Sequence, residues 1–191
     1  MITLSQLWLP ILLSAVFVFI VSSILHMVIP IHKGDCKKMP GEDKVLDAMR
    51  AQGLQPGSYM FPGAENMKDC GTPEMIEKYK RGPVGHLIVV PSGGINMGKS
   101  LIQWFVYTLV VGVLCAYIAA LVFPAGAPCA GVFRITFAAA VLAYSVGSIP
   151  ESIWKGVKWS ITMKFVFDGI LYGLATAATF GWLWPAGAGT P

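Results

Sequence analysis

The chain has 191 residues, of which 55% are hydrophobic, with a net charge of +4 and a mean hydropathy of +0.64. Soluble globular domains are usually less apolar, so this composition excludes an ordinary soluble enzyme. The ten cations between residues 32 and 99 are interspersed with eight carboxylates, so we expect no nucleic-acid-binding surface.

Four long apolar runs lie along the chain, at Leu7–Ile29, Leu101–Phe123, Gly131–Ile149 and Phe165–Trp184. Each has about 20 residues, enough for a helix to cross the hydrocarbon core of a membrane. We therefore predict an all-α membrane protein with four transmembrane helices and a small cytoplasmic insert between helices one and two. The predicted parts are a first transmembrane helix in 1–31, the insert in 32–99, and a three-helix transmembrane group with a short outer tail in 100–191.

The positive charges predict how the chain lies in the membrane. All Lys and Arg residues except Arg134 fall within 32–99 and 150–164. Cytoplasmic loops carry such an excess, so we expect both segments in the cytoplasm and both termini outside. Trp104 and Trp159 then suit the inner interface, which agrees with this orientation.

The insert carries two helix patterns. Acidic residues open Glu42–Gln52, and Gly53 follows as a helix terminator. Thr72 precedes Pro73, which is typical of an N-cap followed by the first helical residue. We expect this second helix to end near Arg81, before the Gly-Pro pair that follows it.

Two further segments of the insert are less regular. Pro56–Gly63 is rich in turn residues, and Val84–Val90 is a short apolar run that either forms a strand or lies against the membrane. Gly93–Ser100 matches the phosphate-loop pattern G-x-x-x-x-G-K-[ST], but a phosphate loop needs a parallel sheet that this short insert cannot build. We interpret the glycines as a joint before the second span, with Lys99 as an interface anchor, and expect no nucleotide.

Small residues recur every four positions in the last three spans, whereas the first span shows no such stripe. This spacing keeps them on one helix face, where small side chains let membrane helices approach closely. The expected packing positions are Gly112, Ala116, Ala143, Gly147, Gly169, Gly173, Ala177 and Gly181.

Polar residues also gather at one depth near the cytoplasmic ends of the spans. A His–carboxylate pair there could relay a proton or hold a polar ligand. The alternative is that Asp168 pairs with Lys164 one turn away, beside the lipid headgroups. We expect this second arrangement, with Asp168 partly hydrated at the rim of a helix contact and with Lys164 or Tyr172 closer to it than His26. The candidate residues of this polar layer are His26, Gln103, Tyr107, Ser148 and Asp168.

We expect no cofactor and no metal ion. A lone membrane histidine cannot supply both axial ligands of a haem. His32, Cys36, Cys70 and His86 fit no standard zinc spacing.

The segments Lys99–Phe105 and Phe167–Pro185 resemble a group of small four-span bacterial integral membrane proteins of unassigned function. The resemblance implies a bacterial inner-membrane protein, and it carries over no active site to this chain. We expect a non-enzymatic accessory or partner-binding subunit of a larger membrane assembly, in contact with the lipid bilayer and with other membrane subunits or copies of itself. The alternatives are a small oligomeric transporter or channel-like protein that uses the polar layer, and a membrane enzyme that uses His26 and Asp168.

Overall fold

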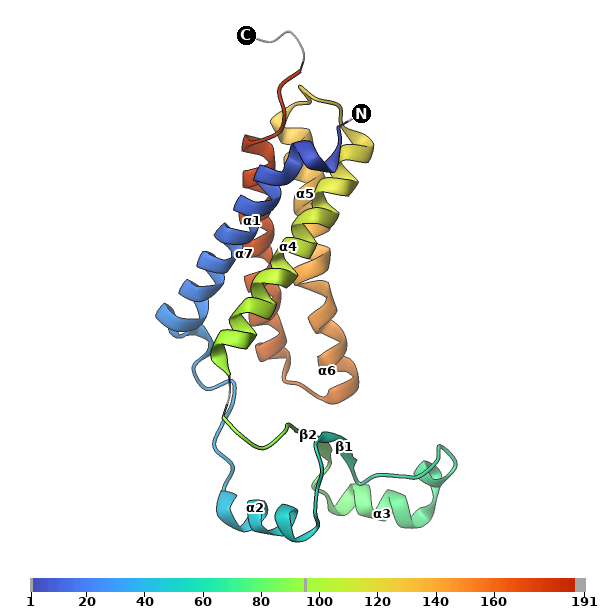
Figure 1. Cartoon of the computed structure of the whole chain (residues 1–191). Coiled ribbons are helices and arrows are strands. Elements are labelled where there is room, and N and C mark those ends of the chain that lie inside the picture. The colour runs from blue at the N-terminus through green and yellow to red at the C-terminus, as the bar shows by residue number, and fades with distance from the viewer. Residues whose placement is uncertain (1, 95, 188–191) are drawn as a thin grey trace. The chain divides into compact units, whose positions relative to one another are not determined.

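The computed structural model describes residues 2–94 and 96–187, which fall into two compact units (Figure 1). The first unit is a helical bundle formed by the described parts of 1–35, 96–153 and 157–191. The second unit is the insert, the described part of 36–95 together with 154–156. Each unit is considered by itself.

The bundle contains four helical stretches that are long and apolar enough to cross a membrane, as the sequence predicts. The first stretch is Leu4–Val28 and the third is Cys129–Lys155. Neither is one regular helix, because short 3₁₀ or π turns flank or interrupt its α-helical part. The α-helices of the bundle are α1 (Trp8–Ser23), α4 (Met97–Val122), α5 (Cys129–Tyr144), α7 (Trp159–Trp182) and, up to Ile153, α6 (Ile149–Lys155).

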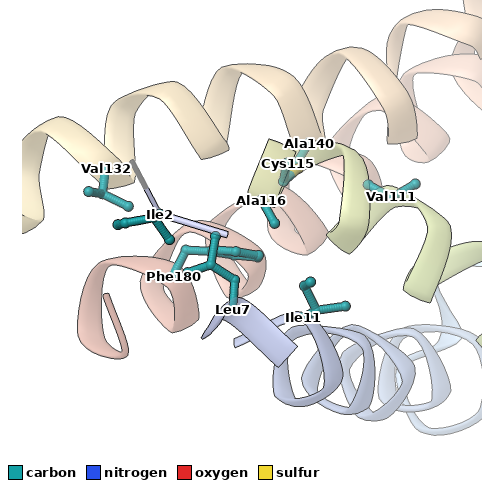
Figure 2. Packing of buried hydrophobic residues seen from close by; sticks show 9 residues of the cluster. All are labelled: Ile2, Leu7, Ile11, Val111, Cys115, Ala116, Val132, Ala140 and Phe180. Atoms are coloured by element: carbon teal, nitrogen blue, oxygen red, sulfur yellow. The ribbon is translucent and has the colours of Figure 1, made fainter. Parts of the chain in front are cut away.

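An apolar core fills the end of the bundle at which α5 begins and α7 finishes (Figure 2). Leu7, Val132 and Phe180 are each completely buried there. Trp184 Nε1 donates a hydrogen bond of 3.0 Å to the Pro124 carbonyl oxygen, which ties the segment after α7 to the loop after α4. We call this region the apolar end of the bundle.

Glycines bring α7 against α5. A Cβ atom at Gly169 would lie 2.8 Å from the backbone carbonyl of Tyr144, and one at Gly173 would lie 2.8 Å from Val141 Cγ2. No larger residue fits at Gly169 unless the helices separate. Gly112 likewise allows α4 to approach α1 closely, because a Cβ atom at this position would lie 3.3 Å from the Ile11 carbonyl oxygen of α1.

The other expected packing positions differ among themselves. Ala116, Ala177 and Gly181 are buried, and Ala143 is half-buried against the core. Gly147 is exposed with open space around it, so its place on a packing face is a wrong expectation. Gly147 lies in the 3₁₀ turn Val146–Ser148, which breaks the four-residue spacing after α5.

The first span also has a small-residue face, contrary to the sequence-based expectation. Ser14, Ala15 and Ser22 are buried, and Val18 is completely enclosed. The Ser14 and Ser22 hydroxyls donate to backbone carbonyls three residues earlier in α1, at 2.9 Å each. Because each serine hydroxyl forms its hydrogen bond within the helix, serine serves as a small packing residue. A search for Ala and Gly alone overlooks such positions.

The insert contains α2 (Glu42–Ala51), α3 (Pro73–Arg81) and a two-stranded antiparallel sheet of β1 (Gly57–Phe61) and β2 (Gly85–Val89), in which Tyr59 faces Leu87. This sheet corrects the all-α expectation. It also corrects the interpretation of 56–63 as turns, since β1 lies inside that segment.

Both helix predictions for the insert are confirmed. Gly53 adopts φ 62° directly after α2, a backbone conformation that glycine reaches without strain. Thr72 Oγ1 accepts a hydrogen bond of 3.3 Å from the Met75 N–H and caps α3, which ends at Arg81.

Candidate functional site

The opposite end of the bundle, where α1 finishes and α7 begins, is polar. It starts from an irregularity in the backbone after α1. Pro30 has no N–H and favours an extended residue before it, and Ile29 is extended at φ −90° and ψ 123°. The Ile29 N–H reaches back five residues to the Ile24 carbonyl, at 2.9 Å, and closes a π-helical turn over Ile24–Val28.

This turn carries one histidine and leads to a second. His26 lies within the π turn, and the 3₁₀ turn Pro30–His32 then places His32 beside it. The two imidazole rings stack with their centroids 4.4 Å apart and their planes 10° from parallel. The side chain of His26 is 42% exposed and that of His32 only 13%, so His32 is the more enclosed of the pair.

Asp168 of α7 faces both histidines. Its Oδ2 atom lies 2.7 Å from His32 Nε2, in a hydrogen bond between residues 136 apart in sequence, and 3.9 Å from His26 Nε2. Asp168 is 1% exposed. Among the residues that the structure describes, nothing offers a hydrogen bond to its other oxygen, Oδ1. A buried carboxylate oxygen without a partner is costly, which marks this position as one with a role beyond packing.

A second carboxylate lies on the far side of His32. Asp35 Oδ2 lies 2.8 Å from His32 Nδ1, and Lys164 donates a hydrogen bond from Nζ to Asp35 Oδ1. The hydrogen bond from Lys164, followed by that from His32, holds the pKa of Asp35 below its ordinary value. The Asp35 side chain is therefore a fixed anion that orients the imidazole of His32.

These contacts overturn the expected environment of Asp168. Asp168 is buried and not partly hydrated, and it binds His32 and not Lys164. Lys164 instead pairs with Asp35, which lies 129 residues earlier in sequence. The reason is the turn at Pro30, which returns residues 31–35 to the bundle and offers Lys164 a second carboxylate.

The remaining candidates of the polar layer do not join this site. The Tyr107 hydroxyl donates to the Ala143 carbonyl at 2.9 Å and ties α4 to α5, and the Ser148 hydroxyl donates to the Ser145 carbonyl at 2.7 Å within its own turn. Gln103 is exposed. His26 and Asp168 are thus the two candidates that the structure brings together.

His32 and Asp35 belong to this site although neither is among the residues predicted for it. By sequence both fall in the predicted insert, where His32 is a candidate only for a zinc site with Cys36, Cys70 and His86. The structure places His32 in the bundle unit and those three residues in the other unit. A usable signal was present, because two histidines and an aspartate flank a proline directly after a membrane span.

An aromatic cluster lies next to the site on α4, α5 and α7. Trp104 Nε1 donates a hydrogen bond of 2.9 Å to Ser22 Oγ and fixes α4 to α1. The ring of Trp104 also contacts those of Tyr107, Tyr144 and Tyr172, with centroids 5.5 to 6.4 Å apart. The hydrogen bond from Trp104 to Ser22 holds α1 against α4 one turn before His26.

No known protein family, curated protein or solved structure matches this chain. The geometry of the polar end is therefore the basis for assigning a function.

Proposed function

We propose that this chain is a multi-pass bacterial inner-membrane protein, with both termini outside, that binds a small cation at the polar end of its bundle. Four helices of sufficient length and apolarity support the membrane location. The concentration of Lys and Arg in 32–99 and 150–164 supports a cytoplasmic position for that end.

The observation that carries the proposal is the state of the Asp168 carboxylate. It is buried, and its Oδ1 atom has no partner among the described residues. The nearby cation Lys164 is already paired with Asp35. His32 satisfies only the Oδ2 atom of Asp168, so the buried carboxylate keeps a second oxygen that a small cation can bind.

Access to the site also fits a small ligand. Asp168 and His32 are enclosed, whereas nearly half of the His26 side chain is exposed. A ligand therefore reaches Asp168 past His26. The enclosure by α1, α7 and the turn at Pro30 favours an ion or a single ammonium group over a large substrate.

Thermal unfolding of the purified full-length protein in detergent tests this proposal. The probes are ethanolammonium, magnesium, zinc and manganese chlorides, with tetrabutylammonium chloride, whose cation is too large for the enclosed site, as the control. We expect at least one cation to raise the unfolding temperature of the wild type and not that of Asp168→Asn, because a ligand that binds only the folded state stabilises it. Asp47→Asn, at an exposed position of α2, is the matched control. If no cation shifts the wild type, the proposal is wrong.

Labelling of two native cysteines tests the proposed orientation of the chain in the membrane. Cys129 opens α5, whereas Cys36 begins the insert, and both are exposed. We expect a membrane-impermeant maleimide added to intact cells to label a variant that keeps only Cys129 and to miss one that keeps only Cys36. The reverse labelling would invert the topology.

A second candidate function is partner binding through the insert. No residue of α2 is buried, although Val45, Ala48 and Met49 line an apolar groove on it with Leu54. A helix of a small unit gains stability when such a face is covered. This supports the idea of an accessory subunit whose insert contacts another membrane protein.

Photo-crosslinking in cells separates the two faces of α2. A photoreactive residue in place of Met49 should attach a second chain at a defined mass, whereas one in place of the exposed Asp47 should not. Equal crosslinking from both positions, or none from either, would contradict partner binding by this face.

A further inference from the structure

We propose that His26, His32 and Asp168 bind a divalent transition-metal ion. This inference rests on the proposed cation site and names its ligand. One nitrogen of each histidine and one oxygen of Asp168 lie within 4.8 Å of one another. Ligand atoms in a tetrahedral site with bonds of about 2.1 Å lie about 3.4 Å apart. The distances of 2.7 Å and 3.9 Å from Asp168 Oδ2 to the two Nε2 atoms bracket that value.

The hydrogen bonds of both imidazoles leave the same nitrogen for the ion. His26 Nδ1 lies 3.1 Å from the Ser22 carbonyl oxygen, and His32 Nδ1 lies 2.8 Å from a carboxylate oxygen of Asp35. Both partners are acceptors, so each Nδ1 carries a proton and donates it. Each Nε2 then faces Asp168 as the ligand nitrogen, and a histidine whose other N–H binds a carbonyl or carboxylate is the usual arrangement around metal ions.

Asp35 and Lys164 form the outer part of this site. The chain of contacts runs from Lys164 through Asp35 and His32 to Asp168. Lys164 neutralises Asp35, so the carboxylate of Asp168 supplies the one net negative charge beside the ion. Asp35 is a positioning residue, because it fixes the ring and the protonated nitrogen of His32 without reaching the ion.

The ligand set favours a transition metal over other cations. Two imidazole nitrogens and one carboxylate suit zinc, iron, manganese or cobalt, whereas magnesium and calcium prefer oxygen ligands. A separation of 2.7 Å between His32 Nε2 and Asp168 Oδ2 requires a proton between these two atoms. The ion takes the place of that proton, which leaves to water when the ion binds.

The stacked histidines indicate how the site closes. Two nearly parallel rings cannot both point a lone pair at one ion, so one ring turns about its Cβ–Cγ bond. His32 is held on both sides, by Asp35 and Asp168, whereas the more exposed His26 has one hydrogen bond, to the Ser22 carbonyl, so His26 is the ring that adjusts by bending that bond. Three protein ligands leave a fourth position open, which is typical of sites that exchange their ion or act on a ligand, and not of closed structural sites.

The test uses the full-length protein in detergent, stripped with EDTA and loaded with cobalt(II) as a spectroscopic probe and zinc(II) as a competitor. We expect one cobalt ion per chain, with visible absorption bands of a tetrahedral or five-coordinate site that zinc abolishes. His32→Asn and Asp168→Asn should each weaken binding at least tenfold. His86→Asn is the matched control, because it removes an exposed histidine of the insert and should leave binding unchanged. Cys36→Ser and Cys70→Ser control for thiol ligands.

Asp35→Asn gives a readout that separates a positioning role from ligation. It should weaken cobalt about 10- to 100-fold while the visible bands keep their shape, because the ligands are unchanged. Unfolding temperatures of all variants in EDTA show that they are folded. If cobalt binding is absent, or is lost in His86→Asn and kept in Asp168→Asn, the metal site is overturned. If an ethanolammonium shift that depends on Asp168 persists in that case, the cation site stands and only its assignment to a metal fails.

Discussion

The two ends of the helical bundle are built from opposite chemistry. At the apolar end, Leu7, Val132 and Phe180 are completely buried, and the helices meet through uncharged side chains. At the polar end, two histidines surround one buried carboxylate. The apolar end has every feature of a packing core, whereas the polar end encloses a charge that packing alone does not need.

If the polar end binds a cation as proposed, stability and binding depend on different ends of the bundle. Contacts at the apolar end are stabilising and replaceable by other apolar groups. The polar end holds Asp168 at a cost in free energy, which is characteristic of sites kept for chemistry. Variants at the apolar end should therefore change the free energy of unfolding, and variants at the polar end should change cation binding.

Phe180→Ala should have the largest effect on stability. It removes a completely buried ring from the apolar core, and we expect a loss of about 3–5 kcal/mol in the free energy of unfolding. Cation binding at the other end should be unchanged in the fraction that remains folded. Phe17→Ala, at a ring of α1 that is 39% exposed, is the control and should cost much less. Similar losses from both variants, measured by denaturant titration in mixed micelles, would remove the distinction.

Gly169→Ala should disturb both stability and cation binding, because Gly169 adjoins Asp168 and lies in the α5–α7 contact at the polar end. The new Cβ atom would lie 2.8 Å from the backbone of Tyr144, which cannot move aside as a side chain can. We expect a loss of about 1–3 kcal/mol in stability and weaker cation binding. Gly147→Ala meets nothing within 4 Å and should be silent. If Gly169→Ala is equally silent in thermal unfolding, the close contact does not exist.

Asp168→Asn should change stability by only about 1 kcal/mol, since the amide is nearly isosteric and can keep one hydrogen bond to His32. The response to cations should disappear. Stability is measured by thermal unfolding, and the cation response by the same scan with and without zinc. A large loss of stability together with an intact cation response would reverse the roles assigned to the two ends.

Thr72→Ala should act on the insert alone. It removes the N-cap of α3 and should cost about 1 kcal/mol locally. Hydrogen exchange of the first-turn amides of α3 should become faster, while the amides of α7 keep their protection. Ser58→Ala, at an exposed position of β1, provides the comparison. Faster exchange in α7 would show that the two units unfold together.

The smallest expected effect is a dependence of α3 on pH. A hydrogen bond from Lys78 lowers the pKa of Glu74 below its ordinary value of 4.5. A carboxyl group with a lowered pKa stabilises the fold above its unfolded value, and this contribution is lost as the pH falls through the folded value. Protection of α3 should therefore decrease slightly below about pH 4.5. Glu74→Gln should remove that decrease, and an unchanged pH profile would contradict it.

Local pattern by itself determined much of this protein. Apolar runs of sufficient length define the four long helices, because each segment satisfies its own backbone hydrogen bonds. Thr72, Pro73 and Gly53 define the ends of α2 and α3 through interactions within a few residues. The small residues of α7, including Gly169 and Gly173, predict a packing face because their spacing follows the helical repeat. All of these features depend on neighbours in sequence.

Only the tertiary structure decided the candidate site and the small sheet. The pairing of β1 with β2 joins a turn-rich segment to an apolar run. Pro56 lies before β1 and Pro62 and Gly63 lie after it, so turn residues on both sides hide a five-residue strand from local pattern. The contact between His32 and Asp168 depends on the turn at Pro30 and on the rotation of α1 and α7 about their own axes. Hydropathy fixes the depth of a residue in a membrane but not that rotation. The direction in which Asp168 points is set by Gly169 and Ser145 at the contact between α7 and α5, far from His32 in sequence.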